Sequence, residues 1–478
     1  MAYEVVIGLE VHTQLLTRSK MFCACSADYA SAPPNTHVCP VCLGMPGVLP
    51  VINEKAIEYT VMTALALNCT IPEHTKFDRK NYFYPDLMKG YQISQYDAPI
   101  GKGGWLTVDS NGEKKRINIT RVHLEEDTAK LLHRGDYSLI DVNRSGVPLM
   151  EIVSEPEIGS PAEARDYLVR LHNILRYLGV STANMEEGSF RCDANISIRP
   201  ANTRKLLPKV EVKNMNSFKA VYQALEYEVK RQEKVLEEGG KVVQETRGWI
   251  DETGVTVLQR TKEYAEDYRY FPEPDLPPLA LERDWIEKIR AQLPELPEAR
   301  RDRFVTRYGL SLYDASILTG SRAMADYFED CAKLAGPGKA KTVSNWLLGD
   351  FSRLLNATNT GIENARISPE HLADLLVLVD NGAISGPTAK AVLEDMFQTG
   401  KVAGEIVSEK KLGQISDTGE IREVIKQVMA DNAAAVADYA AGKQQALTFI
   451  VGQVMKATRG RANPGVVREI IVQELGGK

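Results

Sequence analysis

The sequence predicts an amino-terminal α+β domain with a largely antiparallel sheet, followed by two all-α domains. Up to about residue 290, short strand-like runs mix with amphipathic helices, without regular strand–helix alternation or a glycine-rich turn between strand and helix. Beyond that point, apolar residues recur almost entirely at helical spacing. A chain of 478 residues is long enough for about three domains. We place these domains at residues 1–292, 293–405 and 406–478.

One helix of the first domain is marked at both ends. Ser160 is suited to cap its amino terminus, Pro161 suits the first helical position, and Glu163 completes a capping box. Gly179 is suited to end the helix. The apolar stripe between them comprises Leu168, Leu171, Ile174, Leu175 and Leu178.

Two proline clusters, Phe271–Pro278 and Leu293–Pro297, indicate a stiff boundary after the first domain. The later helical segment from Ile421 to Met429 has a clear apolar face. It follows a loop around residues 413–419.

The composition is that of an ordinary globular protein, with 44% hydrophobic and 26% charged residues. No apolar run approaches the roughly 18 residues of a membrane span, and the first residues do not resemble a signal peptide. Seven cysteines in such a chain do not indicate a disulfide framework, so we expect a soluble protein in a reducing, cytoplasmic compartment. A net charge of −6 argues mildly against a nucleic-acid-binding surface over the whole protein, but not against a local one.

Four cysteines form two close pairs, Cys23 with Cys25 and Cys39 with Cys42. This pattern predicts a structural zinc site, in which each pair supplies two ligands of a tetrahedron. The spacer between Cys23 and Cys25 is short, so His37 remains an alternative ligand. Metal-free, reduced thiols are the other interpretation. The remaining cysteines are expected to fill the core; they are Cys69, Cys192 and Cys331.

The strand-like runs have apolar residues on one face and charged residues on the other. The apolar runs are Val5–Val11, Val122–Leu124, Ile196–Ile198 and Val210–Val212, and Glu151 lies in a further apolar run. The polar positions are Glu10, His12, His123, Glu125, Arg191, Asp193, Asn195, Glu211 and Lys213. They can be solvated side chains of a sheet with one wet face. The recurrence of Glu and His with Arg and Lys favours a Mg²⁺-dependent ATP site instead, and no Walker A sequence is present.

The segment Lys76–Gln95 is too polar for a core and too aromatic for a plain surface loop. Its Arg79, Lys80 and Lys89 are suited to phosphate, and its tyrosines to a base or ribose. A surface loop anchored by tyrosines explains the composition equally well.

These segments occur in one order along the chain: Ile7–His12, the cysteine pairs with Pro46–Gly47, Asp78–Asp86, His123–Asp127, Asp141–Leu149, Ser189–Asn195 and Glu211–Asn214. In this order the chain resembles the B subunits of heterotrimeric aspartyl/glutamyl-tRNA amidotransferases over its whole length. The resemblance implies a cradle-shaped first domain whose catalytic sheet is similar to that of glutamine synthetase. It also implies ATP-dependent phosphorylation of the side-chain carboxylate of Glu or Asp misacylated on tRNA(Gln) or tRNA(Asn). Ammonia then displaces phosphate to give Gln-tRNA(Gln) or Asn-tRNA(Asn).

The resemblance also implies roles for individual residues. The expected Mg²⁺ ligands are Glu10, His12, Glu125 and Glu151, which with Asp193 make up the catalytic set. The expected ATP and phosphate contacts are Arg79, Lys80, Asn81, Tyr82, Lys89, Ser189, Arg191 and Lys213.

No glutaminase signature is recognisable in the sequence. The resemblance implies that an amidase A subunit supplies ammonia and that a small C subunit joins the two. The carboxy-terminal region carries a local cluster of basic residues. They can be solvated side chains at a helix end, or, as the resemblance implies, they can bind tRNA. The expected tRNA-binding residues are Lys456, Arg459, Arg461 and Arg468.

Two other functions explain part of the sequence. A free-standing ATP-dependent amide ligase for a small carboxylic acid would use the same polar strands, but it leaves the helical domains without a role. A non-catalytic, zinc-stapled RNA-binding protein explains the cysteines and the basic tail, but not the carboxylates on the strands.

Overall fold

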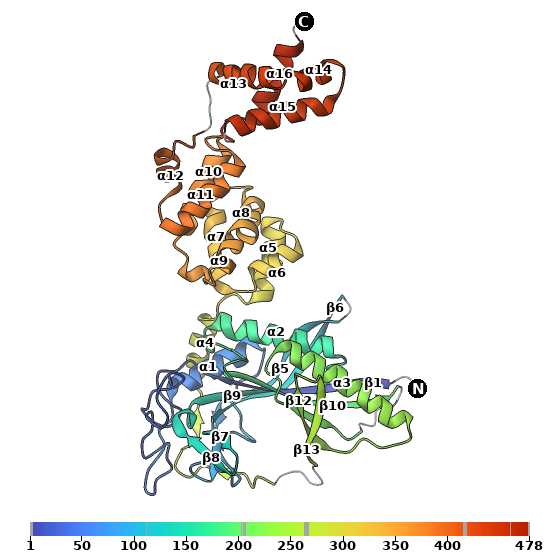
Figure 1. Cartoon of the computed structure of the whole chain (residues 1–478). Coiled ribbons are helices and arrows are strands. Elements are labelled where there is room, and N and C mark those ends of the chain that lie inside the picture. The colour runs from blue at the N-terminus through green and yellow to red at the C-terminus, as the bar shows by residue number, and fades with distance from the viewer. Residues whose placement is uncertain are drawn as a thin grey trace. The chain divides into compact units, whose positions relative to one another are not determined.

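The computed structural model describes residues 3–110, 112–201, 203, 207–261, 267–413, 418–458 and 460–476. The chain divides into two compact units, Met1–Leu296 and Pro297–Lys478 (Figure 1). The predicted fold class, an α+β region followed by helices, is confirmed.

The first unit is built on an eight-stranded sheet with the order β13-β12-β11-β10-β1-β9-β6-β5. All neighbouring strands are antiparallel except β11 and β12, so the predicted, largely antiparallel sheet is confirmed. The strands are β1 Tyr3–Gln14, β5 Gly101–Ser110, β6 Glu113–Glu126, β9 Pro148–Ser154, β10 Phe190–Pro200, β11 Val210–Lys213, β12 Glu245–Ile250 and β13 Val255–Thr261.

Three helices pack on one face of this sheet, where α2 and α3 lie side by side (Figure 1). They are α1 Glu54–Ala66, α2 Pro161–Leu178 and α3 Phe218–Glu237. The alternating apolar residues of the strands, such as Ile7, Leu9 and Val11, are buried in the core between sheet and helices. Burial of this apolar face leaves the intervening polar residues on the opposite face.

Helix α2 begins and ends where its sequence predicts, but the Glu163 carboxylate accepts from the Gly159 backbone N–H at 2.9 Å, one residue before the capping-box position. The Ser160 hydroxyl accepts a hydrogen bond from the Glu163 backbone N–H at 3.1 Å, and Pro161 occupies the first turn. Gly179 ends the helix with φ +69°, a left-handed conformation that glycine adopts without a steric penalty.

Shorter strands and a hairpin complete the first unit. They are β2 His74–Thr75, β3 Asp78–Asn81, β4 Tyr91–Ser94, β7 Lys130–Arg134, β8 Tyr137–Asp141, β14 Phe271–Pro272 and β15 Leu279–Ala280, followed by helix α4 Arg283–Ala291. Phe271 and Pro272 pair with β3, so the first proline cluster lies inside this unit, whereas the second lies at its end. Cys69 and Cys192 are buried in the core, as predicted.

The second unit is helical. Its helices are α5 Pro297–Tyr308, α6 Leu312–Leu318, α7 Arg322–Ala335, α8 Ala340–Trp346, α9 Ser352–Ala357, α10 Pro369–Asp380, α11 Gly386–Thr399, α12 Ala403–Glu409, α13 Thr418–Asp431, α14 Ala433–Ala440, α15 Gln444–Ala457 and α16 Pro464–Gly476. One apolar cluster runs from Phe304 to Ile406 and includes Cys331, and another runs from Ile421 to Ile471. The predicted apolar face of α13 contributes Ile421, Ile425 and Val428 to the latter. The division of this unit at residue 405 stays a prediction.

Candidate active site and metal centre

Four polar residues stand directly opposite one another on neighbouring strands of the large sheet. Arg191 of β10 pairs with His12 of β1, His12 pairs with Glu151 of β9, and Glu151 pairs with His123 of β6. Each is flanked in its strand by buried residues, all apolar except Thr13, so all four project from the face opposite the core. The antiparallel register therefore assembles the row from strands far apart in the sequence.

His12, Glu125 and Glu151 form a compact group, in which one potential ligand atom from each lies within 4.8 Å of the others. His12 Nε2 is 3.7 Å from Glu125 Oε1 and 3.5 Å from Glu151 Oε2. His123 Nε2 lies 3.2 Å from Glu151 Oε2, so Glu151 stands between two imidazoles. Two carboxylates and an imidazole in this arrangement are suited to a divalent cation.

The two carboxylates of this group are buried, which excludes their interpretation as solvated side chains, whereas His12 is half-buried. Glu125 is 2% and Glu151 is 7% exposed. Burial alone would raise the pKa of Glu151, but His123 and His12 hold that pKa well below its usual value. Burial opposes protonation of His12, yet Glu151 and then Glu125 raise its pKa to about 9. The two carboxylates therefore attract positive charge, and a cation bound by the His12 imidazole has to displace its proton.

The group lies in a cavity of about 640 Å³. Of the residues expected at the active site, nine line it: Glu10, His12, Lys80, Tyr82, Glu125, Glu151, Arg191, Asp193 and Lys213. Asn195 Nδ2 donates to Glu10 Oε1 at 2.8 Å, and the Lys213 ammonium pairs with Asp193. The cavity thus combines a carboxylate–histidine group with three cationic side chains from the expected set.

Four expected phosphate-binding residues are not among the described residues that line this cavity. Arg79 donates to both carboxylate oxygens of Glu273 at 2.7 Å. Lys89 pairs with Glu126. The Asn81 amide donates to the Arg269 carbonyl at 2.9 Å, and the Ser189 hydroxyl accepts from the Asn184 N–H at 2.9 Å.

Further residues line the cavity that were given no individual role, although the sequence marks His123, Asn195 and Glu211 among them as polar strand positions. They are Gln92, Gln95, Tyr96, Arg121, His123, Asp127, Thr128, Leu149, Asn195, Lys209, Glu211, Arg260, Asp267, Tyr268 and Tyr270. Tyr270 stacks on Tyr96, with ring centroids 4.3 Å apart. His123 and Asp127 lie within a segment that the sequence marks as distinctive, whereas no local pattern places Tyr268 and Tyr270 beside β6 and β9. Tyr268 and Tyr270 reach this place because β14, which directly follows them, pairs with β3.

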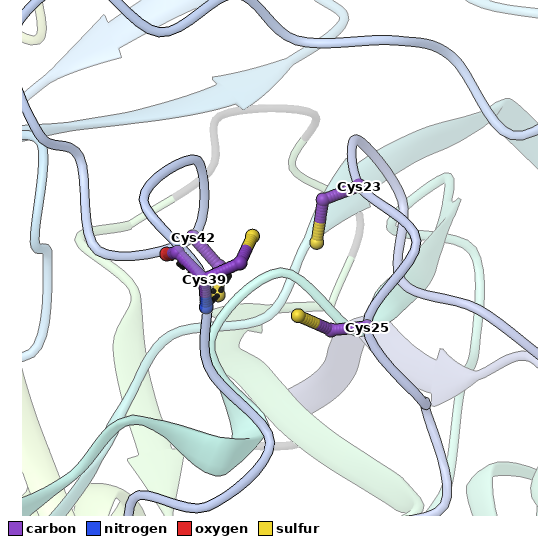
Figure 2. A group of neighbouring side chains, drawn as sticks. All are labelled: Cys23, Cys25, Cys39 and Cys42. Atoms are coloured by element: carbon purple, nitrogen blue, oxygen red, sulfur yellow. Dashed lines mark hydrogen bonds between the residues drawn. The ribbon is translucent and has the colours of Figure 1, made fainter.

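The two cysteine pairs converge from separate loops, and their sulfur atoms point toward one another (Figure 2). All four Sγ atoms lie within 4.8 Å of one another. The Cys39 backbone N–H donates to Cys42 Sγ at 3.2 Å, and the buried Lys20 ammonium lies 3.8 Å from the same sulfur. A hydrogen bond from Cys23 outweighs burial and, with Lys20, lowers the pKa of Cys42 to about 4.

The hydrogen bond with Cys42 raises the pKa of Cys23, and burial raises the pKa of Cys25 to about 11, so the low value belongs to Cys42 alone. The geometry of the four thiols is that of a cluster that can hold a metal. His37, the alternative ligand, is outside this group. Its backbone N–H donates to Asn143 Oδ1 at 2.8 Å, and its carbonyl accepts from Lys20.

Three of the expected tRNA-binding residues are among the described ones. Lys456 of α15 and Arg468 of α16 are exposed, and Arg461 is half-buried. Arg459 lies outside the described residues. Within the described part of the chain, no helix is long and apolar enough to cross a membrane.

Comparison with known proteins identifies the family. Residues 5–287 match the GatB/GatE catalytic domain and residues 326–475 match the GatB domain. The chain is 60% identical to the B subunit of the aspartyl/glutamyl-tRNA(Asn/Gln) amidotransferase from Dehalococcoides mccartyi strain CBDB1, over 99% of both chains. It is 56% identical to the corresponding protein from Caldanaerobacter subterraneus, over 99% of this chain and all of that one. The chain belongs to this family of amidotransferase B subunits.

Membership in this family confirms the predicted resemblance and the predicted enzyme class, a ligase component of the tRNA-dependent amidotransferase type. Proteins of this family are named as one component of a larger assembly, so a complex of several different chains is indicated. The matched catalytic domain covers the sheet that carries His12, Glu125 and Glu151.

Proposed function

We propose that this chain uses ATP to phosphorylate the side-chain carboxylate of Glu misacylated on tRNA(Gln) or of Asp misacylated on tRNA(Asn). A carboxylate oxygen attacks the γ-phosphorus, the bond to the β-phosphate oxygen breaks, and ADP leaves. Ammonia from an amidase partner then forms the C–N bond while inorganic phosphate leaves. The products are Gln-tRNA(Gln) or Asn-tRNA(Asn).

The observation that carries this proposal is the His12–Glu125–Glu151 group, with its two buried carboxylates, in a cavity that is also lined by Lys80, Arg191 and Lys213. Phosphoryl transfer requires positioning and charge neutralisation around phosphate, with little covalent chemistry from the protein. An anionic carboxylate and an anionic phosphate repel each other in such a step. Cationic side chains on the cavity wall reduce this repulsion.

In the proposed site, His12, Glu125 and Glu151, with Glu10 beside them, hold Mg²⁺. The bound Mg²⁺ supplies charge neutralisation at the phosphates. Lys80, Arg191 and Lys213 bind anionic oxygens of ATP or of the aminoacyl group, and the paired Asp193 fixes the Lys213 ammonium. Tyr82 and Tyr268 line the cavity with their ring centroids 5.8 Å apart, and they are suited to limit the access of water. Arg79, Asn81, Lys89 and Ser189 support the surrounding segments through the contacts described above.

We also propose that Cys23, Cys25, Cys39 and Cys42 bind a structural Zn²⁺. Four protein ligands complete a tetrahedral site and leave no position for water, so such a zinc holds loops together and does not take part in the reaction.

The proposed partners are an amidase A subunit and a small C subunit, and the proposed compartment is the cytoplasm. The exposed basic residues of the tail are proposed to bind tRNA phosphates.

The test is ATP cleavage by the assembled complex with Glu-tRNA(Gln) and, separately, with Asp-tRNA(Asn). Hydroxylamine in place of glutamine should trap an acyl phosphate as the hydroxamate on the tRNA-bound amino acid. Cleavage should need both the misacylated tRNA and Mg²⁺ or Mn²⁺. Correctly acylated Gln-tRNA(Gln) is the matched control, because it lacks the carboxylate.

Two outcomes would contradict the proposal. ATP cleavage and hydroxamate formation with a free small carboxylic acid, independent of tRNA, would indicate a free-standing ligase. Tight tRNA binding without any ATP cleavage would indicate an RNA-binding protein.

A further inference from the structure

Asp127 is a buried carboxylate at the edge of the cavity, and it is not part of the His12–Glu125–Glu151 group. It follows β6 and is only 2% exposed. Its Oδ2 accepts from Gln14 Nε2 at 2.7 Å and from Arg191 Nη2 at 2.9 Å. Its Oδ1 accepts from the Thr128 backbone N–H at 2.9 Å and lies 3.7 Å from Arg144 Nε. A carboxylate accepts about four hydrogen bonds, so both oxygens are largely committed to these donors.

The two arginines beside Asp127 differ in what else they contact. Arg144 donates to the carbonyls of Thr128 and Ala129 at 2.9 and 3.0 Å, so it stabilises the segment that follows Asp127. Arg191 instead lines the cavity beside His12 in the row of four residues. Its Nε atom is buried and has no hydrogen-bond partner among the described residues. A buried donor without a partner is costly unless an acceptor arrives with a ligand.

Asp127 is itself held in place by contacts with three other parts of the unit. Its backbone N–H donates to the Val147 carbonyl at 2.8 Å, and its carbonyl accepts from Gly146 at 2.9 Å. Gln14, at the end of β1, also contacts the Tyr29 hydroxyl at 3.0 Å. Tyr29 lies between the two cysteine pairs in the sequence. The carboxylate is therefore fixed to the segment before β9, to β1 and to the cysteine-bearing loop.

We propose that Asp127 is a positioning residue that orients the Arg191 guanidinium through Nη2, leaving its buried Nε to bind an anionic oxygen of the substrate. Gln14 and Tyr29 hold the Asp127 carboxylate in the orientation that this contact requires. The identity of the anion, a phosphate or carboxylate oxygen, rests on the proposed function. The positioning itself rests only on the contacts of Asp127 and Arg191.

The first test is a double-mutant cycle on the assembled complex, with ATP cleavage dependent on misacylated tRNA as the readout. Asp127→Asn should lower kcat roughly ten- to hundredfold, because the charge that orients Arg191 is lost while the shape is retained. In an Arg191→Ala background, the same Asp127→Asn change should have almost no further effect. In an Arg144→Ala background, it should retain its full effect. Tyr29→Phe, a milder change, should show a smaller loss that also disappears in the Arg191→Ala background.

Glu163→Gln is the matched control, because Glu163 is another buried carboxylate of this unit, paired with Lys115 at 2.7 Å, and it does not line the cavity. It should leave kcat unchanged. The inference would be overturned if Asp127→Asn lowered kcat as much in the Arg191→Ala background as in the wild type. It would also be overturned if the effect of Asp127→Asn on kcat disappeared in the Arg144→Ala background. An inactive wild-type complex would contradict the proposed function instead.

The second test does not depend on activity. A crystal structure of the Asp127→Asn variant should show the Arg191 guanidinium displaced from its place beside His12, and the Tyr29→Phe variant should show a smaller displacement. An unmoved guanidinium in Asp127→Asn would overturn the positioning role, whatever reaction the cavity performs. If Asp127→Asn does not fold, the same two tests are made with Tyr29→Phe: the position of the Arg191 guanidinium in its crystal structure, and its double-mutant cycle with Arg191→Ala.

Discussion

His12 and Glu151 are cross-strand partners on β1 and β9, and His12 Nε2 lies 3.5 Å from Glu151 Oε2. The pair comes directly from the antiparallel register, so any side chain at either position would face the other. With Glu125 beside them, the arrangement places two buried carboxylates within reach of one cation.

The first prediction concerns this group. Glu125→Gln should lower kcat for tRNA-dependent ATP cleavage by roughly a hundredfold or more, because a neutral amide is a weak ligand for Mg²⁺. The substitution keeps the side-chain volume, so the melting temperature should change little. Ser94 Oγ contacts Glu125 Oε2 at 3.2 Å and can also contact an amide.

The control for this variant is Glu155→Gln, which changes a half-buried carboxylate just after β9 that accepts from the Thr120 hydroxyl at 2.7 Å and does not line the cavity. It should have normal kcat. Near-normal turnover in Glu125→Gln, with the requirement for Mg²⁺ intact, would show that the cation binds elsewhere.

A second prediction concerns the cysteine cluster. Protein purified without chelator should contain one zinc per chain by elemental analysis. Cys42→Ser should lower zinc content and the melting temperature together, because the metal holds separate loops in place. Cys69→Ser is a suitable comparison, because Cys69 is buried away from the cluster and its replacement should leave zinc content unchanged. Metal-free protein with an unaltered melting temperature in Cys42→Ser would contradict the zinc site.

A third prediction concerns the pH dependence of stability in the second unit. Glu329 Oε1 lies 2.6 Å from Arg303 Nη1, and Glu329 Oε2 lies 2.6 Å from Arg300 Nη2. Burial opposes ionisation, but the hydrogen bonds from Arg303 and Arg300 lower the pKa of Glu329 to about 2. Because the folded-state pKa is below that of the unfolded chain, this carboxylate stabilises the fold above about pH 4.5. Its contribution is lost as the pH falls toward 2.

Glu329→Gln should therefore lower the free energy of unfolding by about 1–2 kcal/mol at neutral pH, a value already reduced for solvent screening. The difference from wild type should shrink between pH 4.5 and 2 in thermal unfolding measured across that range. Glu394→Gln, which disrupts an exposed ion pair with Arg353, should have little effect at any pH. A constant difference between Glu329→Gln and wild type across the range would contradict the assignment.

A fourth prediction concerns the tail. Replacing Lys456, Arg461 and Arg468 together by Ala should weaken tRNA binding and flatten the dependence of log Kd on log salt, because each phosphate contact releases counterions. The apolar cluster from Ile421 to Ile471 does not involve these side chains, so stability should hold. Lys426→Ala removes another exposed cation of the same region, paired with Glu423, and should leave the salt slope unchanged. An unchanged slope in the triple variant would exclude a role of these residues in tRNA binding.

Local features of the fold were predictable from the sequence. Ser160 and Gly179 mark the ends of α2 because capping depends on residues within one turn. The alternation of Ile7, Leu9 and Val11 places Glu10 and His12 on the polar face because a strand has a period of two. These rules do not depend on the rest of the molecule.

Features that depend on distant segments were not predictable. The parallel pairing of β11 with β12 has no local signal. Burial of Glu125 and Glu151 requires the tyrosine-bearing segments that lie over the polar face. The pairing of Arg79 with Glu273 likewise depends on β14 returning to β3, and residues at such separations carry no shared pattern in a single sequence.

The central position of β1 has a consequence for synthesis of the protein. This strand lies between β9 and β10, yet it ends at Gln14, whereas β9 begins at Pro148 and β10 at Phe190. At typical rates of about 5–20 residues per second, the ribosome needs roughly 7 to 27 seconds after Gln14 to reach the first of these neighbours. During that interval the apolar face of β1 and both of its unpaired edges are open to other chains. We therefore expect the nascent chain to depend on chaperones over this interval, and a slower ribosome to increase aggregation.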